Sequence, residues 1–199
     1  MPSQIFLVAP LDADPASFVA KLRSVLDATE VSALLIPRGQ HDDAAYAALV
    51  KAVLPWAQGA DCAVLVEGEP ALVKMLGADG LHVTGSVQAV KAAIAALKPA
   101  LIVGSAADDT RHDAMSKGEL EVDYILFGPL SGPIDPEMRD MAGWWAETME
   151  IPSVLSDPAA SAETADDEGC EFIGLGESLW QAPDPATAIK GIAARLETL

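Results

Sequence analysis

Polar residues at the ends of short apolar runs are the positions of this chain best placed to do chemistry. The clearest is His82, which stands between Leu81 and Val83 and follows Gly77-Ala78-Asp79-Gly80. Side chains alternate along a strand, so the imidazole points away from the side that Leu81 and Val83 occupy. It could donate a hydrogen bond to a substrate or transfer a proton, or it could be a hydrogen-bonded histidine of the core.

A second run, Val122 to Leu130, repeats this arrangement, with Asp123 before the strand and a Gly-Pro turn after it. Gly128, Pro129 and Ser131 would line a substrate if the strand ends at a binding face, or they would form only a turn. Ser105, which follows Gly104 at another strand end, either binds a ligand or caps the next segment.

Anion binding has two candidate locations. Gly174, Gly176 and Ser178 read as a strand that runs into a short helix, where backbone N–H groups could hold a phosphate, although Glu177 places a carboxylate beside them. Arg38 is one of few cations and would bind an anionic group or pair with an acid. Glu67 and Glu69 flank Gly68 at the end of the third apolar run, where they could face one metal ion or form the acidic start of a helix at Pro70.

Eight repeats of an apolar run, a turn and an Ala-rich amphipathic segment would position these residues. The expected strands are Ile5–Pro10, Ser32–Pro37, Cys62–Glu67, Gly80–Val83, Ala100–Gly104, Val122–Phe127, Ser153–Leu155 and Glu171–Leu175. The expected helices are Pro15–Asp27, Asp43–Leu54, Pro70–Leu76, Ser86–Leu97, Thr110–Lys117, Pro136–Thr148, Ala159–Asp166 and Pro185–Glu197.

These units predict a compact (β/α)8 TIM barrel that occupies residues 1–199 as a single domain. Asp-Pro pairs at residues 14, 135, 157 and 184 mark helix starts. An open doubly wound sheet is the alternative, but the first turn, residues 10–14, lacks the glycines typical of that fold. The seventh strand spans only three residues, and the acidic segment after it forms either a helix or a loop.

Composition excludes some partners. The chain has 51% hydrophobic residues, and 12 Lys and Arg against 30 Asp and Glu give a net charge of −18. Such an acidic protein repels nucleic acids and anionic membranes, and no apolar run is long enough to cross a bilayer. With no basic leader and with Cys62 and Cys170 in predicted strands without metal-ligand spacing, we expect a cytoplasmic protein with buried thiols.

Four motifs together resemble thiamine-phosphate synthases: Gly77-Ala78-Asp79-Gly80-Leu81-His82, Gly104-Ser105, Asp123-Tyr124 and Gly128-Pro129. The resemblance is specific over about residues 60–132. It implies a (β/α)8 enzyme that joins a pyrimidine diphosphate to a thiazole phosphate and releases pyrophosphate with the help of magnesium. It matches His82 and Ser105 to catalytic positions and the Gly128-Pro129 turn to the substrate, and, with the Trp144-Trp145 pair, it suggests a homodimer.

Several of the family's charged positions are absent. Its Asn-Asp after the third strand reads Glu67-Gly68, and its Gly-Gln-x-Asp after the histidine strand reads Thr84-Gly85-Ser86-Val87, so the magnesium ligands are not kept. The position of its pyrophosphate-binding lysine, after Gly-Pro, lies in Ser131 to Ile134, which contain no cation. Arg38 is the only relic of its basic second strand.

Two functions follow. The first is a divergent thiamine-phosphate synthase with impaired or altered activity, no evident cofactor and a small phosphorylated ligand. The second is a non-catalytic paralogue that binds a small molecule or serves as a subunit of an assembly.

Overall fold

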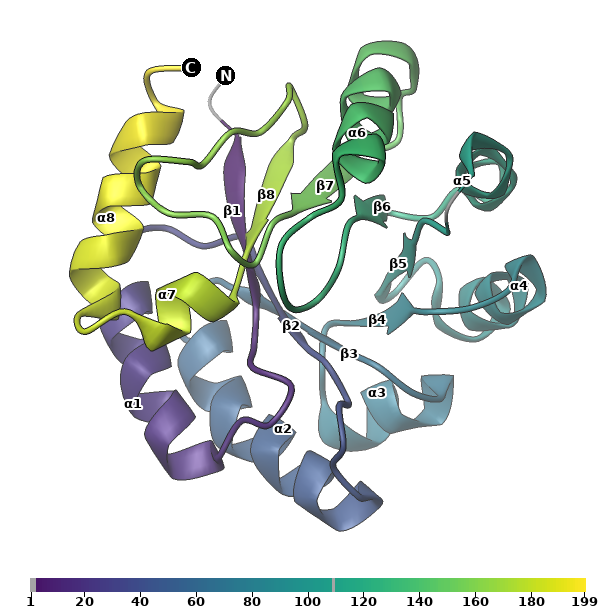
Figure 1. The fold of residues 1–199 in the computed structure, drawn as a ribbon. Helices are drawn as coiled ribbons and strands as arrows, with labels where there is room; N and C mark the ends of the chain where they lie inside the picture. Colours follow the sequence, from purple (N-terminus) through teal and green to yellow (C-terminus); the bar gives the residue numbers. More distant parts are fainter. Residues whose placement is uncertain (1–2, 109) are drawn as a thin grey trace.

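Eight short strands pair in parallel and in chain order, and β8 pairs with β1 to close the barrel. The computed structural model describes residues 3–108 and 110–199. The strands are β1 Gln4–Val8, β2 Ala33–Ile36, β3 Ala63–Val66, β4 Gly80–Val83, β5 Ile102–Ala106, β6 Tyr124–Phe127, β7 Ser153–Ser156 and β8 Phe172–Leu175. The predicted (β/α)8 barrel is therefore confirmed, and the helices surround the strands in Figure 1.

Helices follow the strands as the Asp-Pro pairs predict. They are α1 Pro15–Leu26, α2 Asp43–Gln58, α3 Pro70–Leu76, α4 Val87–Leu97, α5 Arg111–Gly118, α6 Pro136–Thr148, α7 Glu177–Gln181 and α8 Pro185–Leu196. The carboxylates of Asp14, Asp135 and Asp184 each accept a hydrogen bond from a backbone N–H of the first turn. Figure 1 views the barrel from the carboxyl-terminal ends of its strands, the end where α7 lies.

The helix predicted at Ala159–Asp166 is wrong, because residues 157–171 form turns between β7 and β8. The carboxylate of Asp157 does not cap a helix but accepts from Arg139 Nη2 at 2.6 Å. The carbonyl of Pro158 accepts from Ser178 N at 2.9 Å. This segment is therefore held by contacts with α6 and α7 and does not form a helix.

The barrel interior is filled by one set of alternating side chains. Phe6, Leu35, Leu65, Tyr124 and Val154 belong to a buried cluster distinct from the larger core between strands and helices. The Tyr124 ring lies against Gly104, where an added Cβ would come 2.0 Å from two ring carbons. It also meets the Phe6 ring edge-on, with centroids 5.5 Å apart.

Three carboxylates tie neighbouring strands together at the amino end of the barrel, and we call them the carboxylate clasps. Each stands just before an even-numbered strand and accepts from the first N–H groups of the preceding strand. Asp79 accepts from Val64 N at 2.7 Å, Asp123 from Val103 N at 2.7 Å, and Glu171 from Ser153 N at 2.8 Å. This is the structural role of the aspartates that precede the fourth and sixth strands.

Both cysteines are buried free thiols, as expected, but they lie just before β3 and β8 instead of within them. Burial raises the pKa of Cys62 to about 12 and that of Cys170 to about 11, so neither is a reactive thiolate at neutral pH. Among the described residues, the helices are too short or too polar to span a bilayer.

Candidate functional site

His82 lies inside the barrel near the carboxyl ends of the strands, which confirms its predicted inward orientation. Its Nδ1 is 2.9 Å from the hydroxyl of Tyr124, and the two rings are nearly parallel, with an interplanar angle of 9°. His82 is 1% exposed, and its Nε2 has no hydrogen-bond partner among the residues that the structure describes. A buried ring nitrogen without a partner is a feature that a bound ligand could satisfy.

Burial sets the protonation of this pair. It lowers the pKa of His82 to about 3, helped by the positive charge of Lys117, so the imidazole is neutral at physiological pH. Burial also raises the pKa of Tyr124 well above its ordinary value, which keeps the phenol protonated. If the phenol donates to Nδ1, Nε2 carries the imidazole proton and is the free donor.

Glu67 stands beside His82 at the end of β3. Because Leu65 pairs with Gly80 and Val66 with Leu81, the next position of β3 comes level with His82. Its Oε2 accepts from Arg38 N at 2.8 Å, and its backbone N–H donates to the Tyr46 hydroxyl at 2.9 Å. Burial raises the pKa of the Glu67 carboxyl, and the Arg38 N–H bond opposes this.

These residues do not fit the magnesium site that the family resemblance implies. Within residues 3–108 and 110–199, no three His, Cys, Asp or Glu side chains lie close enough to hold a metal. Thr84 and Ser86 follow β4 in place of acids, and Ser86 accepts from Ala89 N as the cap of α4. A single half-buried carboxyl with a raised pKa is a poor ligand for a doubly charged cation.

Ser105 does not join His82. It pairs with Val83 and Ile125, both in the core between strands and helices, so it lies on the helix side of the sheet. Its hydroxyl donates to Val83 O at 3.3 Å and to Ala106 O at 3.2 Å, and the residue is fully buried. Ser105 therefore has a structural role, and its hydroxyl does not face a ligand at the barrel mouth.

In the turn predicted to bind phosphate, the hydrogen-bond donors of Ser178 bond to other parts of the protein. Ser178 donates its N–H to Pro158 O and its hydroxyl to Ala160 O. Gly176 is buried, and an added Cβ would come 3.1 Å from Pro158. Glu177 Oε2 accepts from Gly132 N at 3.0 Å. The structure therefore places residues 158–160 over the Gly174–Ser178 turn, where a phosphate would otherwise approach.

The Gly128-Pro129 turn is held by the neighbouring strand. Gly128 has φ +114°, and Pro129 O accepts from the Ser156 hydroxyl at 2.6 Å.

Ser131, which follows this turn, lines a mouth cavity of about 400 Å³ together with Lys21, Glu177, Trp180 and others. Lys21 was missed by sequence reasoning because it lies within α1, away from any strand end; its Nζ donates to Trp180 O at 2.6 Å.

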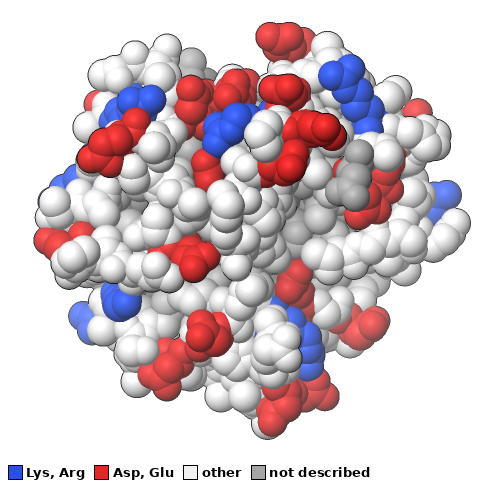
Figure 2. All heavy atoms as spheres, viewed as in Figure 1, with Lys and Arg blue, Asp and Glu red and all other residues white. Residues whose placement is uncertain are grey.

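Several cations near this end are engaged in ion pairs. Arg38 pairs with Asp43, and Arg139 pairs with Asp157. Lys117 is fully buried, 2.7 Å from Asp113 and 3.2 Å from Asp108. Figure 2 shows this face of the molecule, where Asp and Glu predominate around a largely uncharged centre. The surface therefore attracts anionic ligands weakly.

Tyr124 enters the sequence prediction only within the Asp123-Tyr124 motif, with no role for its side chain at the site. Its role rests on contact with His82, 42 residues away, and on the space that Gly104 leaves for its ring. A glycine inside a strand often marks such a close approach, and this was the available signal.

Comparison with known proteins gives a consistent result. The sequence model of the family described as thiamine monophosphate synthase matches residues 5–156. The thiamine-phosphate synthase of Rhodospirillum centenum is 30% identical over 195 residues, which cover 94% of each chain. That of Hyphomonas neptunium is 31% identical, with 99% of this chain and 95% of the relative covered.

Solved structures show the same fold at lower identity. The thiamine phosphate pyrophosphorylase from Pyrococcus furiosus has a TM-score of 0.76 at 16% identity, covering 98% of this chain and 96% of its own. The 3-hexulose-6-phosphate synthase from Salmonella typhimurium also has a TM-score of 0.76, at 17% identity, and covers 100% and 99%.

Proposed function

Because this chain belongs to the thiamine monophosphate synthase family, we propose that it acts in thiamine biosynthesis as a thiamine-phosphate synthase of reduced rate. The reaction would join a pyrimidine diphosphate to a thiazole phosphate and release pyrophosphate. The observation that carries the proposal is the buried His82 Nε2, which has no partner within residues 3–108 and 110–199 and lies near the strand ends within the matched segment.

The mouth residues would act mainly by orientation. A neutral imidazole fixed by Tyr124 can hold one heterocyclic nitrogen or hydroxyl of a substrate through Nε2. The adjacent Glu67 carboxyl, with its raised pKa, offers a second hydrogen-bonding group at the same depth. Holding two reactants in the correct relative geometry lowers the barrier even where charge stabilisation is weak.

The reduced rate follows from electrostatics. Departure of pyrophosphate requires cations, and Arg38, Lys117 and Arg139 are paired with the protein's own acids. The residues present do not form the magnesium site, so no step is assigned to that ion. These same observations favour the second candidate, a non-catalytic barrel that binds one of the family's small molecules without turnover.

One experiment separates the two candidates. The melting temperature is measured with thiazole phosphate, with pyrimidine diphosphate and with pyrophosphate, each with and without magnesium, and thiamine phosphate is assayed in the same samples. Product above the uncatalysed level, reduced at least tenfold in His82→Gln, supports the enzyme. His112→Gln is the matched control, because His112 is exposed on α5. A thermal shift without product supports the binder, and neither shift nor product rejects both.

We also propose a cytoplasmic location, a homodimer and no binding of nucleic acid. The support is the kinship with biosynthetic enzymes, the half-buried Trp144 ring beneath Arg111, and the charge of −18. Its neighbour Trp145 is not available for a subunit contact, since it is buried and donates to Ile151 O. Light scattering of the purified protein tests the dimer.

A further inference from the structure

The amino end of the barrel, opposite the mouth, contains an apolar pocket of about 270 Å³. Its walls are mainly aromatic and aliphatic side chains of the inner face. The lining residues are Gln4, Phe6, Ser32, Ala33, Ala63, Leu65, Ile102, Asp123, Tyr124, Pro152, Val154 and Phe172. We call it the floor pocket.

The pocket exists because small residues stand where barrels usually carry bulky ones. Ala33 of β2 and Ala63 of β3 point inward and line the pocket together with the rings of Phe6, Tyr124 and Phe172. Branched side chains at such positions normally fill the interior. Ala63 and Phe172 are only half-buried, so the pocket is open to solvent.

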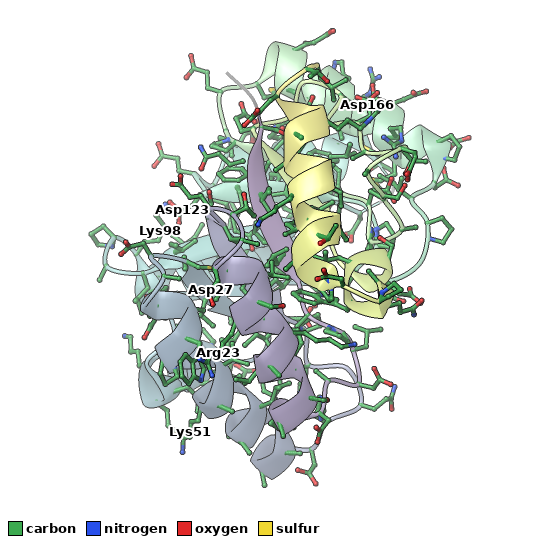
Figure 3. All side chains as sticks on the ribbon, turned by 90° about the vertical axis from the view of Figure 1, so that its left-hand side faces the viewer. Arg23, Asp27, Lys51, Lys98, Asp123 and Asp166 are labelled. Carbon is green, nitrogen blue, oxygen red and sulfur yellow. The ribbon has the colours of Figure 1, made fainter. Side chains whose placement is uncertain are left out.

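The carboxylate and hydroxyl groups at its rim already have partners within the protein. Asp123 pairs with Lys98 at 2.6 Å and accepts from Val103 N, and Gln4 Oε1 accepts from the Ser32 hydroxyl at 2.6 Å. Figure 3 shows Lys98 and Asp123 side by side at this end of the molecule. A charged ligand would lose hydration without gaining an ion pair, because Lys98 and Asp123 already neutralise each other.

We propose that the floor pocket binds a planar, uncharged aromatic molecule of one or two rings. An apolar cavity of about 150 Å³ is enough to hold benzene, and the floor pocket is larger. Aromatic walls favour a ring over an aliphatic chain, since edge and face contacts between rings add to the hydrophobic gain.

Occupancy of the floor pocket is transmitted to the mouth through Tyr124. One part of this side chain lines the pocket, while its hydroxyl lies 2.9 Å from His82 Nδ1. Gly104 and Phe6 confine the ring between them. A ligand that presses on this confined ring therefore alters its hydrogen bond to His82. This inference does not depend on the proposed synthase activity.

The first test uses indole as the probe and calorimetry on the full chain. Indole should bind, and Ala63→Leu should raise its dissociation constant at least tenfold because the added isobutyl group occupies the pocket. Ala95→Leu adds the same group at an exposed position of α4 and should leave binding unchanged. Absence of binding, or equal binding by Ala63→Leu, would overturn the proposal.

A second measurement does not rely on a core substitution. Nuclear Overhauser contacts should connect indole protons with the Val154 and Leu65 methyl groups; contacts located elsewhere on the protein would reject the pocket. Indole should also shift the His82 ring resonances in the parent protein and leave them unmoved in Tyr124→Phe. Equal shifts in both proteins, or none in either, would overturn the link to the mouth.

Discussion

Replacement of Gly104 by alanine should strongly destabilise the protein, because the new methyl group would meet the Tyr124 ring. The Cβ would lie 2.0 Å from ring carbons, whereas ordinary carbon contacts lie at about 3.5–4.0 Å, so the ring must move by roughly 1.5 Å or more. The ring has little room to move, since Phe6 packs edge-on against it and its hydroxyl bonds to His82.

The expected cost combines two effects. Overpacking of a well-filled core costs about 1–3 kcal/mol, and loss of the buried Tyr124–His82 hydrogen bond adds about 1 kcal/mol. We expect the free energy of unfolding to fall by about 2–4 kcal/mol, and the melting temperature by roughly 5–15 °C for a chain of this size. Urea unfolding followed by circular dichroism measures the first quantity, and calorimetry the second.

Two further variants test the cause. Gly143→Ala in α6 places a Cβ at an ordinary 3.5 Å from Glu168 O and should leave stability unchanged or raise it by up to about 1 kcal/mol. Tyr124→Leu combined with Gly104→Ala should lose less stability than the two single changes added together, since the clash is removed. A Gly104→Ala protein within about 0.5 kcal/mol of the parent, or strict additivity in the double variant, would refute the reasoning.

Three other perturbations have expected outcomes. Glu67→Gln removes a carboxyl whose pKa burial raises above its unfolded value; the parent loses stability as pH rises from the unfolded pKa of about 4.3 through the folded value. Its stability relative to the variant, measured by urea unfolding between about pH 4 and pH 8, should therefore decline over that window, and a flat difference would contradict this. Tyr46→Phe removes a donor to Ile36 O and an acceptor for Glu67 N, which should cost about 1–3 kcal/mol in urea unfolding; no measurable loss would mean that water replaces both bonds. Arg139→Met leaves the buried Asp157 carboxylate without its main partner and should cost about 2–4 kcal/mol, with Asp157→Asn added to it restoring part of the loss; a loss below about 0.5 kcal/mol would show that this pair is solvated.

Local signals made most of the fold predictable. Apolar runs covered on both faces located the eight strands, and proline after a capping aspartate located α1, α6 and α8. The same signal failed at Asp157-Pro158 because Arg139, 18 residues earlier, takes the carboxylate. That contact depends on how α6 packs, which is not a local property of the sequence.

The site was less predictable because its geometry depends on strand parity and on distant contacts. His82 was placed inward from the apolar residues that flank it. The side of the sheet on which Ser105 lies follows only from the strand pairing. Gly104 pairs with the inward-facing His82, so the next residue, Ser105, faces the helices. The sequence of residues 174–178 alone does not predict that the Ser178 hydroxyl donates a hydrogen bond to Ala160 O, because Ala160 lies in a different segment.

The carboxylate clasps also describe how the chain is divided. They join β3 with β4, β5 with β6 and β7 with β8, and the bond between Gln4 and Ser32 joins β1 with β2. These bonds thus fasten the eight strands of the closed barrel in four pairs. A break between Leu97 and Lys98 would give two halves with every fastening intact. Segments exchanged with relatives should accordingly be interchangeable at boundaries after α4 or α6, because each clasp carboxylate and its partners then come from one parent.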